Sequence, residues 1–254
     1  MSYLVSCRAY SYGKHIDLAW SHLPTLGIQH VEIPIPSAEQ MDATRGLLAS
    51  NGLSVGSFQG TCDIAAGDAT EAMAAQCDVC KQFGVTRLFV SVKAGETDRQ
   101  LVWDRLRSAG DEAAKRDVII MLETHPDLVT NGDVGAQTMA AVDHPNVRIN
   151  FDTANVYYYN EGVDAVGEIG KVLAYVEGVH LKDTDGGYQK HYFPVLGTGV
   201  VDFPAVVKLL ADRGFDGPFT MELEGMAGVE MTPEEQKQYV ADSAAYLRKI
   251  GLLT

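Results

Sequence analysis

Two kinds of segment alternate along this chain. A helical stretch of mixed polarity ends at a glycine, and a short apolar run rich in β-branched residues follows almost at once. Glycine suits such a turn because the residue after a helix often takes a left-handed conformation, which strains a residue that carries a Cβ. The pattern therefore predicts a repeated unit of helix, tight turn and strand. Its clearest examples are PTLGIQHVEI, ASNGLSVGSF, KQFGVTRLFV and DRGFDGPFTMEL, with Gly27, Gly52, Gly84 and Gly214 in the turn.

Eight apolar runs have the character of strands, and helical stretches separate them. Strands separated by helices pair in parallel through right-handed crossovers, and eight such units close readily into a barrel. The sequence predicts an α/β fold, a single (β/α)8 TIM barrel that occupies residues 1–254 as one domain. The alternative is a doubly wound sheet, but SCRAYSYGKH after the first strand contains neither GxGxxG nor GxxxxGK. The strands begin near Tyr3, Gln29, Leu53, Thr86, Val118, Val147, Val176 and Pro218.

Composition and charge narrow the range of partners. The chain is 46% hydrophobic and 8% aromatic, as globular proteins are. It has 34 acidic and 20 basic side chains, so its formal charge of -14 repels phosphate backbones and anionic membranes. The start MSYLVSCRAYSYGKH lacks the apolar stretch of a secretory signal, and no segment approaches the roughly 20 apolar residues of a membrane span. We expect a cytoplasmic protein without nucleic-acid or membrane partners.

Cysteine usage agrees with that expectation, because four cysteines in 254 residues do not form a disulfide framework. Cys77 and Cys80 make a CxxC inside the helical run ATEAMAAQCDVCKQFG. No second CxxC or histidine pair completes a zinc set. We expect reduced thiols on a helix, with a redox pair as the alternative.

Four consecutive predicted strands end in a residue that can bind a metal. Active sites of such barrels form at the carboxyl ends of the strands, so these residues should meet. Three carboxylates and an imidazole would repel one another and be costly to desolvate unless a cation neutralised them. The segments are VIIMLETHP, VRINFDTAN, VEGVHLKDTD and PFTMELEG, which supply Glu123, Asp152, His180 and Glu222.

Oxygen-rich ligation with one nitrogen and no thiolate favours Mn²⁺, Mg²⁺ or Co²⁺, with Zn²⁺ as a further alternative. Taken singly, each residue has a simpler interpretation: a carboxylate at a strand end can cap the next helix, and a lone histidine can be a satisfied core group. Their position on four successive strands favours one divalent ion, with Mn²⁺ as the first candidate.

Neighbours of these four residues extend the predicted site. Alternation along a strand turns Lys182 to the same side as His180, Glu224 to that of Glu222, and Asn150 to that of Asp152. Lys182 can polarise a substrate oxygen, donate a proton or bind a phosphate; its structural alternative is a salt bridge to Asp183 or Glu224.

Two further residues are expected to face the same mouth. His125 follows Glu123 by two residues and either contacts substrate or caps the following helix. Glu32, at the end of HVEIPIP, either hydrogen-bonds a substrate hydroxyl or orients a metal ligand. The second role is favoured.

The longest predicted loop, residues 183–201, follows the seventh strand and should lie on the catalytic face. Aromatic residues gather in it and in the loop after the sixth strand. They either wall the substrate from water or form contacts in a homo-oligomer. Cations in the predicted loops, including Arg8, Lys14, Lys93 and Lys190, are too scattered in sequence to define a phosphate site. The aromatic residues are Tyr157, Tyr158, Tyr159, Tyr188, Tyr192 and Phe193.

Five segments carry a resemblance that spans nearly the whole chain: LETHPDLVTNG, FDTAN, HLKDTDGG, LGTGVVDF and GFDGPFTMELEG. The chain resembles the xylose isomerase-like TIM-barrel superfamily, which contains sugar phosphate isomerases and epimerases and shares the fold of AP endonuclease family 2. The resemblance implies that the Glu, Asp, His, Glu set binds a divalent ion. It also implies that Glu123 and Glu222 shuttle a substrate proton through an enediolate.

The chain departs from the ketose 3-epimerases of this group at two positions. Asn155 stands where those enzymes commonly carry a histidine that contacts substrate, so Asn155 is a candidate substrate-binding residue. Lys182 stands where several have another residue. We therefore predict an isomerase or epimerase acting on a small ketose, sugar acid or inositol derivative. A dehydratase, other lyase or decarboxylase with the same metal site is the alternative.

Two other classes fit less well. A repair endonuclease of this fold requires a trinuclear zinc cluster with many histidine ligands, and this acidic chain has seven histidines in all. A non-catalytic sugar-binding protein would lack metal affinity. The sequence leaves the substrate and its phosphorylation undecided.

Overall fold

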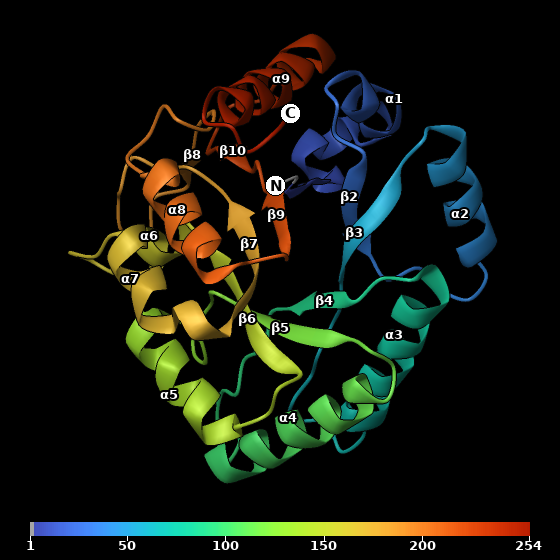
Figure 1. The fold of residues 1–254 in the computed structure, drawn as a ribbon, viewed down its shortest axis with the longest axis vertical. Coiled ribbons are helices and arrows are strands. Elements are labelled where there is room, and N and C mark those ends of the chain that lie inside the picture. The colour runs from blue at the N-terminus through green and yellow to red at the C-terminus, as the bar shows by residue number, and fades with distance from the viewer. Residues whose placement is uncertain (1–2) are drawn as a thin grey trace.

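The computed structural model describes residues 3–254, and its core is a closed barrel of eight parallel strands. The strands follow one another around the barrel in chain order, and β9 closes it against β1 (Figure 1). The predicted (β/α)8 barrel is thus confirmed. The barrel strands are β1 (Leu4–Arg8), β2 (His30–Pro34), β3 (Ser54–Gln59), β4 (Arg87–Val90), β5 (Ile119–Glu123), β6 (Val147–Asp152), β7 (Val176–Leu181) and β9 (Pro218–Met221).

Helices surround the barrel, as crossover connections between parallel strands require (Figure 1). Two short 3₁₀ turns, η1 (Ala9–His15) and η2 (Leu173–Tyr175), complete the connections after β1 and before β7. The helices are α1 (Asp17–Thr25), α2 (Met41–Ser50), α3 (Ala69–Phe83), α4 (Arg99–Ala114), α5 (Gly132–Val142), α6 (Asn155–Tyr159), α7 (Ala165–Val172), α8 (Phe203–Arg213) and α9 (Pro233–Lys249).

The predicted turns take the conformation that their glycines were expected to allow. Gly84 and Gly214 end α3 and α8 with φ values of 70° and 78°, in the left-handed region. Gly27 and Gly52 have φ values of 69° and 67° before β2 and β3. Each barrel strand accordingly begins at the predicted position or one residue later.

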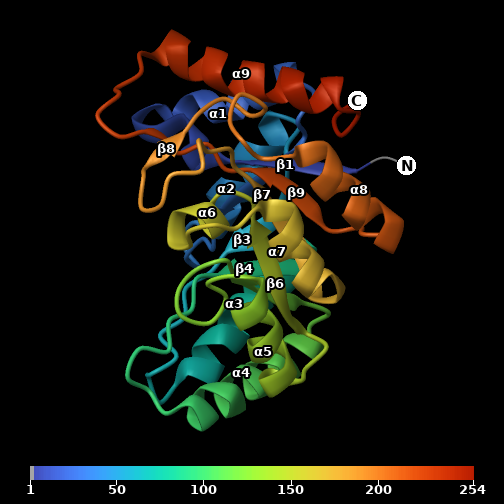
Figure 2. The same cartoon turned by 90° about the vertical axis from the view of Figure 1, so that its left-hand side faces the viewer.

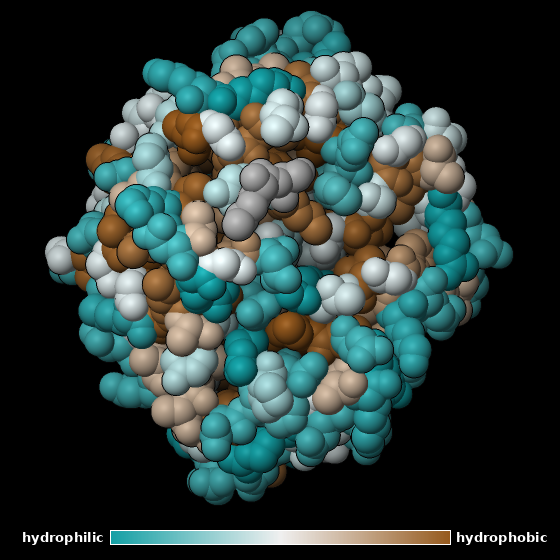
Figure 3. Space-filling view, in the orientation of Figure 1, coloured by the Kyte–Doolittle hydropathy of each residue, from teal (hydrophilic) through white to brown (hydrophobic). Residues whose placement is uncertain are grey.

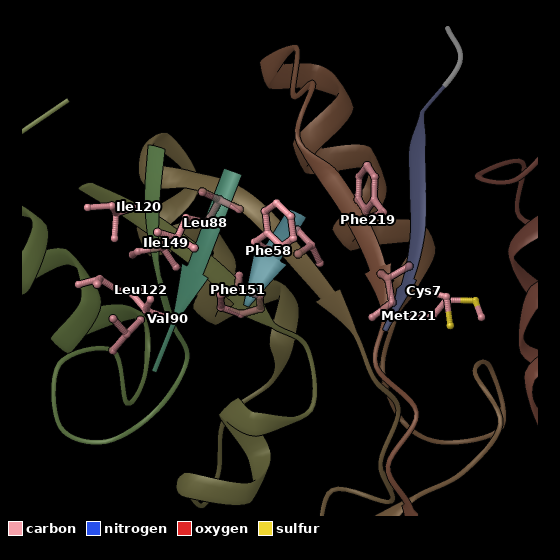
Figure 4. Close-up of a cluster of buried hydrophobic side chains, with 14 of the residues drawn as sticks. Cys7, Phe58, Leu88, Val90, Ile120, Leu122, Ile149, Phe151, Phe219 and Met221 are labelled. Carbon is pink, nitrogen blue, oxygen red and sulfur yellow. The ribbon is translucent and has the colours of Figure 1, made fainter. Parts of the chain in front are cut away.

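Alternation along the strands separates an apolar layer beneath the helices from a more polar interior. Figure 4 shows the apolar layer, including Leu88 and Val90 of β4 and Ile149 and Phe151 of β6. The intervening residues face the barrel axis. There Gly178 is required by packing, since a Cβ at this position would lie 2.5 Å from Asn150 Oδ1 and 2.7 Å from Met121 Sδ. Polar residues inside the strands can therefore reach the mouth of the barrel.

The long segment after β7 folds back over the carboxyl end of the barrel. It contributes β8 (Tyr192–Phe193), which pairs antiparallel with β10 (Gly225–Met226) beyond the last barrel strand. In Figure 2, β8 lies on the side opposite the amino terminus, toward which the carboxyl ends of the strands point. The segment thus lies at the carboxyl ends of the barrel strands, the end at which it was predicted.

The outer surface of the barrel mixes hydrophilic and hydrophobic residues. The face in Figure 3 is mainly hydrophilic at its rim, with hydrophobic residues toward its middle. Within residues 3–254, no helix is long and apolar enough to cross a membrane.

Cys77 and Cys80 are buried free thiols in α3, and burial raises the pKa of Cys77 to about 12. Protonated, inaccessible thiols agree with the expectation of reduced cysteines rather than a redox pair.

Candidate metal centre and active site

The four predicted metal ligands meet at the carboxyl ends of β5, β6, β7 and β9. One ligand atom from each of Glu123, Asp152, His180 and Glu222 lies within 4.8 Å of the others. All four side chains are buried, with exposed fractions of 5% or less. We call these four residues the ligand set.

The atoms facing the centre of this set suit a cation. His180 Nδ1 lies 3.2 Å from Glu222 Oε2 and 3.3 Å from Glu123 Oε1, yet it makes no hydrogen bond. Asp152 Oδ2 is buried and accepts no aligned hydrogen bond; its charged neighbour is Lys182 Nζ at 2.9 Å. Its other oxygen, Oδ1, accepts the backbone N–H groups of Ala154 and Asn155 at 2.8 Å. Because buried polar atoms normally have partners, one imidazole nitrogen and three carboxylates turned toward one point fit a divalent ion.

Glu32 contacts His180 from the side opposite the ligand set. His180 Nε2 lies 3.1 Å from Glu32 Oε1, and Ser57 Oγ donates to Glu32 Oε2 at 2.7 Å. A carboxylate that accepts the Nε2 proton leaves the Nδ1 lone pair free for a metal. Glu32 is buried and is not among the residues that line the cavity described below, so its contacts favour the orienting role over substrate binding.

Lys182 is a buried cation surrounded by carboxylates. Its Nζ lies 2.8 Å from Glu222 Oε2, 2.9 Å from Asp152 Oδ2 and 2.9 Å from Glu224 Oε2. Only 2% of the side chain is exposed. Burial alone would lower the pKa of Lys182, but the surrounding carboxylates, Asp152 first, raise it above its usual value. Lys182 is therefore protonated at neutral pH.

The imidazole of His180 also favours its charged form in the metal-free protein. Burial would lower the pKa of His180, but Glu32 and Glu123 outweigh it and raise that pKa to about 9. Burial would raise the pKa of Glu123, but His125 and His180 hold it well below the usual value. In the absence of a metal, a proton on His180 thus compensates part of the negative charge.

An open cavity of about 380 Å³ lies above the ligand set and suits a ligand of sugar size. Glu123, Glu222, Lys182, His125 and Asn155 all line it. We call this space the central cavity. The other lining residues are Arg8, Gln59, Phe89, Ser91, Tyr158, Tyr159, His191, Phe193 and Glu224.

The two remaining predicted substrate-binding residues have distinct surroundings. His125 Nδ1 lies 2.9 Å from Glu123 Oε2, and its ring packs against Tyr159 with the ring centroids 5.1 Å apart. It does not cap α5, since Asn131 does so. Asn155 Nδ2 donates to the Thr124 carbonyl at 3.1 Å, which fixes the amide at the wall of the cavity.

Arg8 is the main cation whose role the sequence did not reveal. It ends β1, pairs with Glu222 Oε1, and lies 3.5 Å from Glu32 Oε1. Its guanidinium also donates to Gln59 Oε1 at 2.8 Å and stacks over the Phe89 ring. The available signal was its place at a strand end, the same signal that located the ligand set.

Ser91 was also not predicted as a site residue, although it follows β4 directly. Its hydroxyl donates to Glu123 Oε2, on the side of the carboxylate away from His180. A serine after a strand has no distinctive pattern, so only the folded barrel identifies this contact.

A closed parallel barrel with a buried acidic ligand set at its carboxyl end has the architecture of a metal-dependent TIM-barrel enzyme. The chain belongs to the xylose isomerase-like TIM barrel family, whose model matches residues 22–250. This confirms the resemblance inferred from the sequence.

Curated relatives of this chain include dehydratases. Inosose dehydratase of Yersinia enterocolitica is 29% identical over 167 residues, covering 56% of this chain and 53% of the relative. Inosose dehydratase of Klebsiella pneumoniae (strain 342) is 32% identical over 152 residues, covering 51% and 48%. 3-Dehydroshikimate dehydratase of Bacillus anthracis is 26% identical over 104 residues, covering 41% and 36%. The matched regions thus span about half or less of these relatives.

Solved structures with the same fold include dehydratases and epimerases. A probable 3-dehydroshikimate dehydratase of Bacillus anthracis aligns with a TM-score of 0.74 at 17% identity, covering 98% of this chain and 99% of that one. D-allulose 3-epimerase of Methylomonas sp. aligns with a TM-score of 0.72 at 19% identity, covering 98% and 96%. At such identities the likeness establishes the fold alone.

Proposed function

We propose that this protein is a divalent-metal-dependent lyase that removes water from a small polyhydroxylated ketone by way of an enolate. The observation that carries the proposal is the position of Lys182, a buried ammonium beside the ligand set and within the central cavity. Elimination of water needs an acid for the departing hydroxyl as well as a base for the carbon-bound proton. The dehydratases among the relatives support the same class.

The ligand set defines where the ion would be held. When bound there, a divalent ion would polarise the substrate carbonyl and stabilise the negative charge of the enolate. His180 must be neutral to take part, and Glu32 is placed to keep its ring in the required orientation.

Glu123 is the proposed acceptor of the carbon-bound proton. The cationic side chains of Arg8 and Lys182 both contact Glu222, and a proton added to Glu222 would disrupt these contacts. Glu123 instead contacts Ser91, His125 and His180. This asymmetry favours Glu123 as the base.

Lys182 is the proposed donor to the departing hydroxyl. As the bond from carbon to the β-hydroxyl breaks, the ammonium supplies the proton that completes a water molecule, and a carbon–carbon double bond forms. The proton held by Glu123 returns to solvent and Lys182 regains one, which restores both groups.

Epimerisation is the second candidate, and it is the function first predicted from the sequence. Both Glu123 and Glu222 line the central cavity, so two carboxylates are available to a bound ketone. In that case one glutamate would remove the proton and the other would return it. Similarity of fold to D-allulose 3-epimerase is compatible with this alternative.

Proton NMR in D₂O tests both candidates. The protein is stripped of metal with chelator, reloaded singly with Mn²⁺, Mg²⁺, Co²⁺ or Zn²⁺, and incubated with an inosose, 3-dehydroshikimate, D-fructose and D-allulose. We expect metal-dependent deuterium incorporation and loss of water, both abolished in Glu123→Gln. A product that retains every substrate atom would favour the epimerase, and absence of metal binding and exchange would refute enolate chemistry.

A further inference from the structure

We infer that the substrate of the central cavity is uncharged, a neutral polyhydroxylated ketone that bears neither a carboxylate nor a phosphate. This inference deepens the proposed function and rests on it for the ketone. Proteins bind anionic substrate groups through unpaired cations or through free backbone N–H groups. Arg8 and Lys182 in the cavity wall, and the glycine amides of the loop after β7, already have acceptors from the protein itself.

The two cations of the cavity wall are fully engaged. Arg8 contacts Glu222 and Glu32, while Lys182 contacts Asp152, Glu222 and Glu224. An anionic substrate group would have to displace one of these carboxylates. Such a displacement would leave a buried carboxylate without its partner, which is strongly unfavourable.

The total charge of the site also disfavours an anionic substrate. Five carboxylates, two permanent cations and a neutral His180 leave an excess of three negative charges. A divalent ion bound by the ligand set would reduce the excess to one negative charge. None of these states leaves positive charge to spare for an anion. The five carboxylates are those of Glu32, Glu123, Asp152, Glu222 and Glu224.

Glu224 places one of these carboxylates where an entering ligand meets it. Its side chain is 43% exposed, in contrast to the buried ligand set. It lines the central cavity and two adjoining cavities that lead away along η1 and β10. An anion approaching the ligand set from either direction therefore passes a like charge.

The glycine-rich loop after β7 is the usual place for phosphate in such barrels, and here an internal carboxylate fills it. Asp183 Oδ2 accepts the backbone N–H groups of Gly197 and Gly199, each at 2.8 Å. Asp183 Oδ1 accepts that of Val201 at 3.2 Å. Asp183 is buried, so these N–H groups are directed into the protein and away from any ligand.

The adjoining cavity offers no free cation either, as far as residues 3–254 are concerned. Lys14 lines it and pairs with Glu230 at 2.7 Å. His15, also in its wall, has Nε2 3.1 Å from the Met231 carbonyl. A larger substrate that extended into this space would again meet no unpaired cation among the described residues.

Equilibrium binding to the Mn²⁺-loaded protein tests the inference. D-Fructose and D-fructose 6-phosphate form a matched pair that differs by a phosphate, and an inosose and 3-dehydroshikimate contrast a neutral ketone with a carboxylate. We expect the inosose and D-fructose to bind at least about tenfold more tightly than their anionic counterparts. Glu224→Gln should narrow the ratio between the affinities for the neutral and the anionic ligand. Glu39→Gln should leave that ratio unchanged, because Glu39 is an exposed acid that accepts a hydrogen bond from the Ser37 hydroxyl.

Equal or tighter binding of either anionic probe by the unsubstituted protein would overturn the inference. An unchanged ratio in Glu224→Gln would overturn the role given to that carboxylate. The outcome is separable from that of the proposed function: a neutral ketone that binds without metal-dependent deuterium exchange would contradict enolate chemistry and leave the preference for uncharged ligands standing.

Discussion

His180 uses its two ring nitrogens for different contacts: Nε2 lies 3.1 Å from Glu32 Oε1, and Nδ1 lies 3.2 Å from Glu222 Oε2. The ring therefore connects an orienting carboxylate to the ligand set. Its edge also packs on the Phe89 ring, with the centroids 4.7 Å apart, which restricts rotation. A ligand held in this way presents one nitrogen in a fixed direction.

Glu32→Gln should weaken metal binding about ten- to a hundredfold, because the amide keeps the shape but loses the charge that supports His180. Isothermal titration of the chelator-stripped protein with Mn²⁺ measures the change. Glu39→Gln, the same substitution at an exposed position, should leave the affinity unchanged. Equal affinities in all three proteins would show that Glu32 does not act through His180.

The metal-free protein should lose stability as the pH rises from 6.5 to 8.5. The pKa of His180 is raised from 6.5 in the unfolded chain to about 9 in the folded one. The folded state thus binds the extra proton, and this stabilisation is present below pH 6.5 and lost as the pH rises through 9. We expect the free energy of unfolding to fall by about 2 kcal/mol across this range. Urea unfolding with excess chelator measures it.

His180→Asn supplies the control for that pH dependence. Burial lowers the pKa values of His22 and His30, so these histidines contribute a change of the opposite sign near pH 6.5. The variant retains both and lacks only the central imidazole. If the free energy of unfolding of the variant changed with pH as steeply as that of the unsubstituted protein, the assignment of this pH dependence to His180 would be contradicted. Saturating Mn²⁺ should reverse the trend, since metal binding requires the neutral ring.

Lys182→Met should separate proton removal from loss of water. If Lys182 donates to the departing hydroxyl, dehydration should fall about a hundred- to ten-thousandfold, while deuterium exchange falls far less. Both rates are read from the same NMR experiment. Lys182→Arg keeps the positive charge and should preserve the fold. Its rate of dehydration reports whether a positive charge alone is enough for loss of water.

Lys190→Met is the matched control, because Lys190 lies in the same loop and pairs with Asp185 at the surface. It should change neither rate. Equal losses of exchange and dehydration in Lys182→Met would instead indicate that Lys182 acts by holding Asp152 and Glu222 in place.

Asp183→Asn should loosen the loop of residues 183–201. The carboxylate accepts four backbone N–H groups of this loop, and charged acceptors form the stronger hydrogen bonds. We expect a loss of stability of about 1–3 kcal/mol. Hydrogen exchange at Gly197 and Gly199 should accelerate. Asp185→Asn alters an exposed acid two residues away, and protection of those glycine amides should survive it.

Local pattern was enough to predict the barrel and the ligand set. Apolar runs, four of them preceded by a helix and a glycine turn, predicted the eight strand starts, and a metal-ligand residue after an apolar run marked the ends of four strands. The roles of Arg8, Ser91 and Asp183 could not be predicted in this way. Each depends on a partner from another βα unit or from a distant part of its own loop, and an isolated arginine, serine or aspartate carries no pattern.

The sequence alone determined that eight strands form, that they pair in parallel, and that Glu123, Asp152, His180 and Glu222 share one end of the barrel. These features follow from periodicity and chain order, which are local properties. Only the tertiary structure decided which partners the charged side chains have: Arg8 contacts Glu222, Lys182 contacts three carboxylates, and Asp183 accepts the loop amides. Side-chain contacts depend on distances across the closed barrel, and those distances exist only after it has folded.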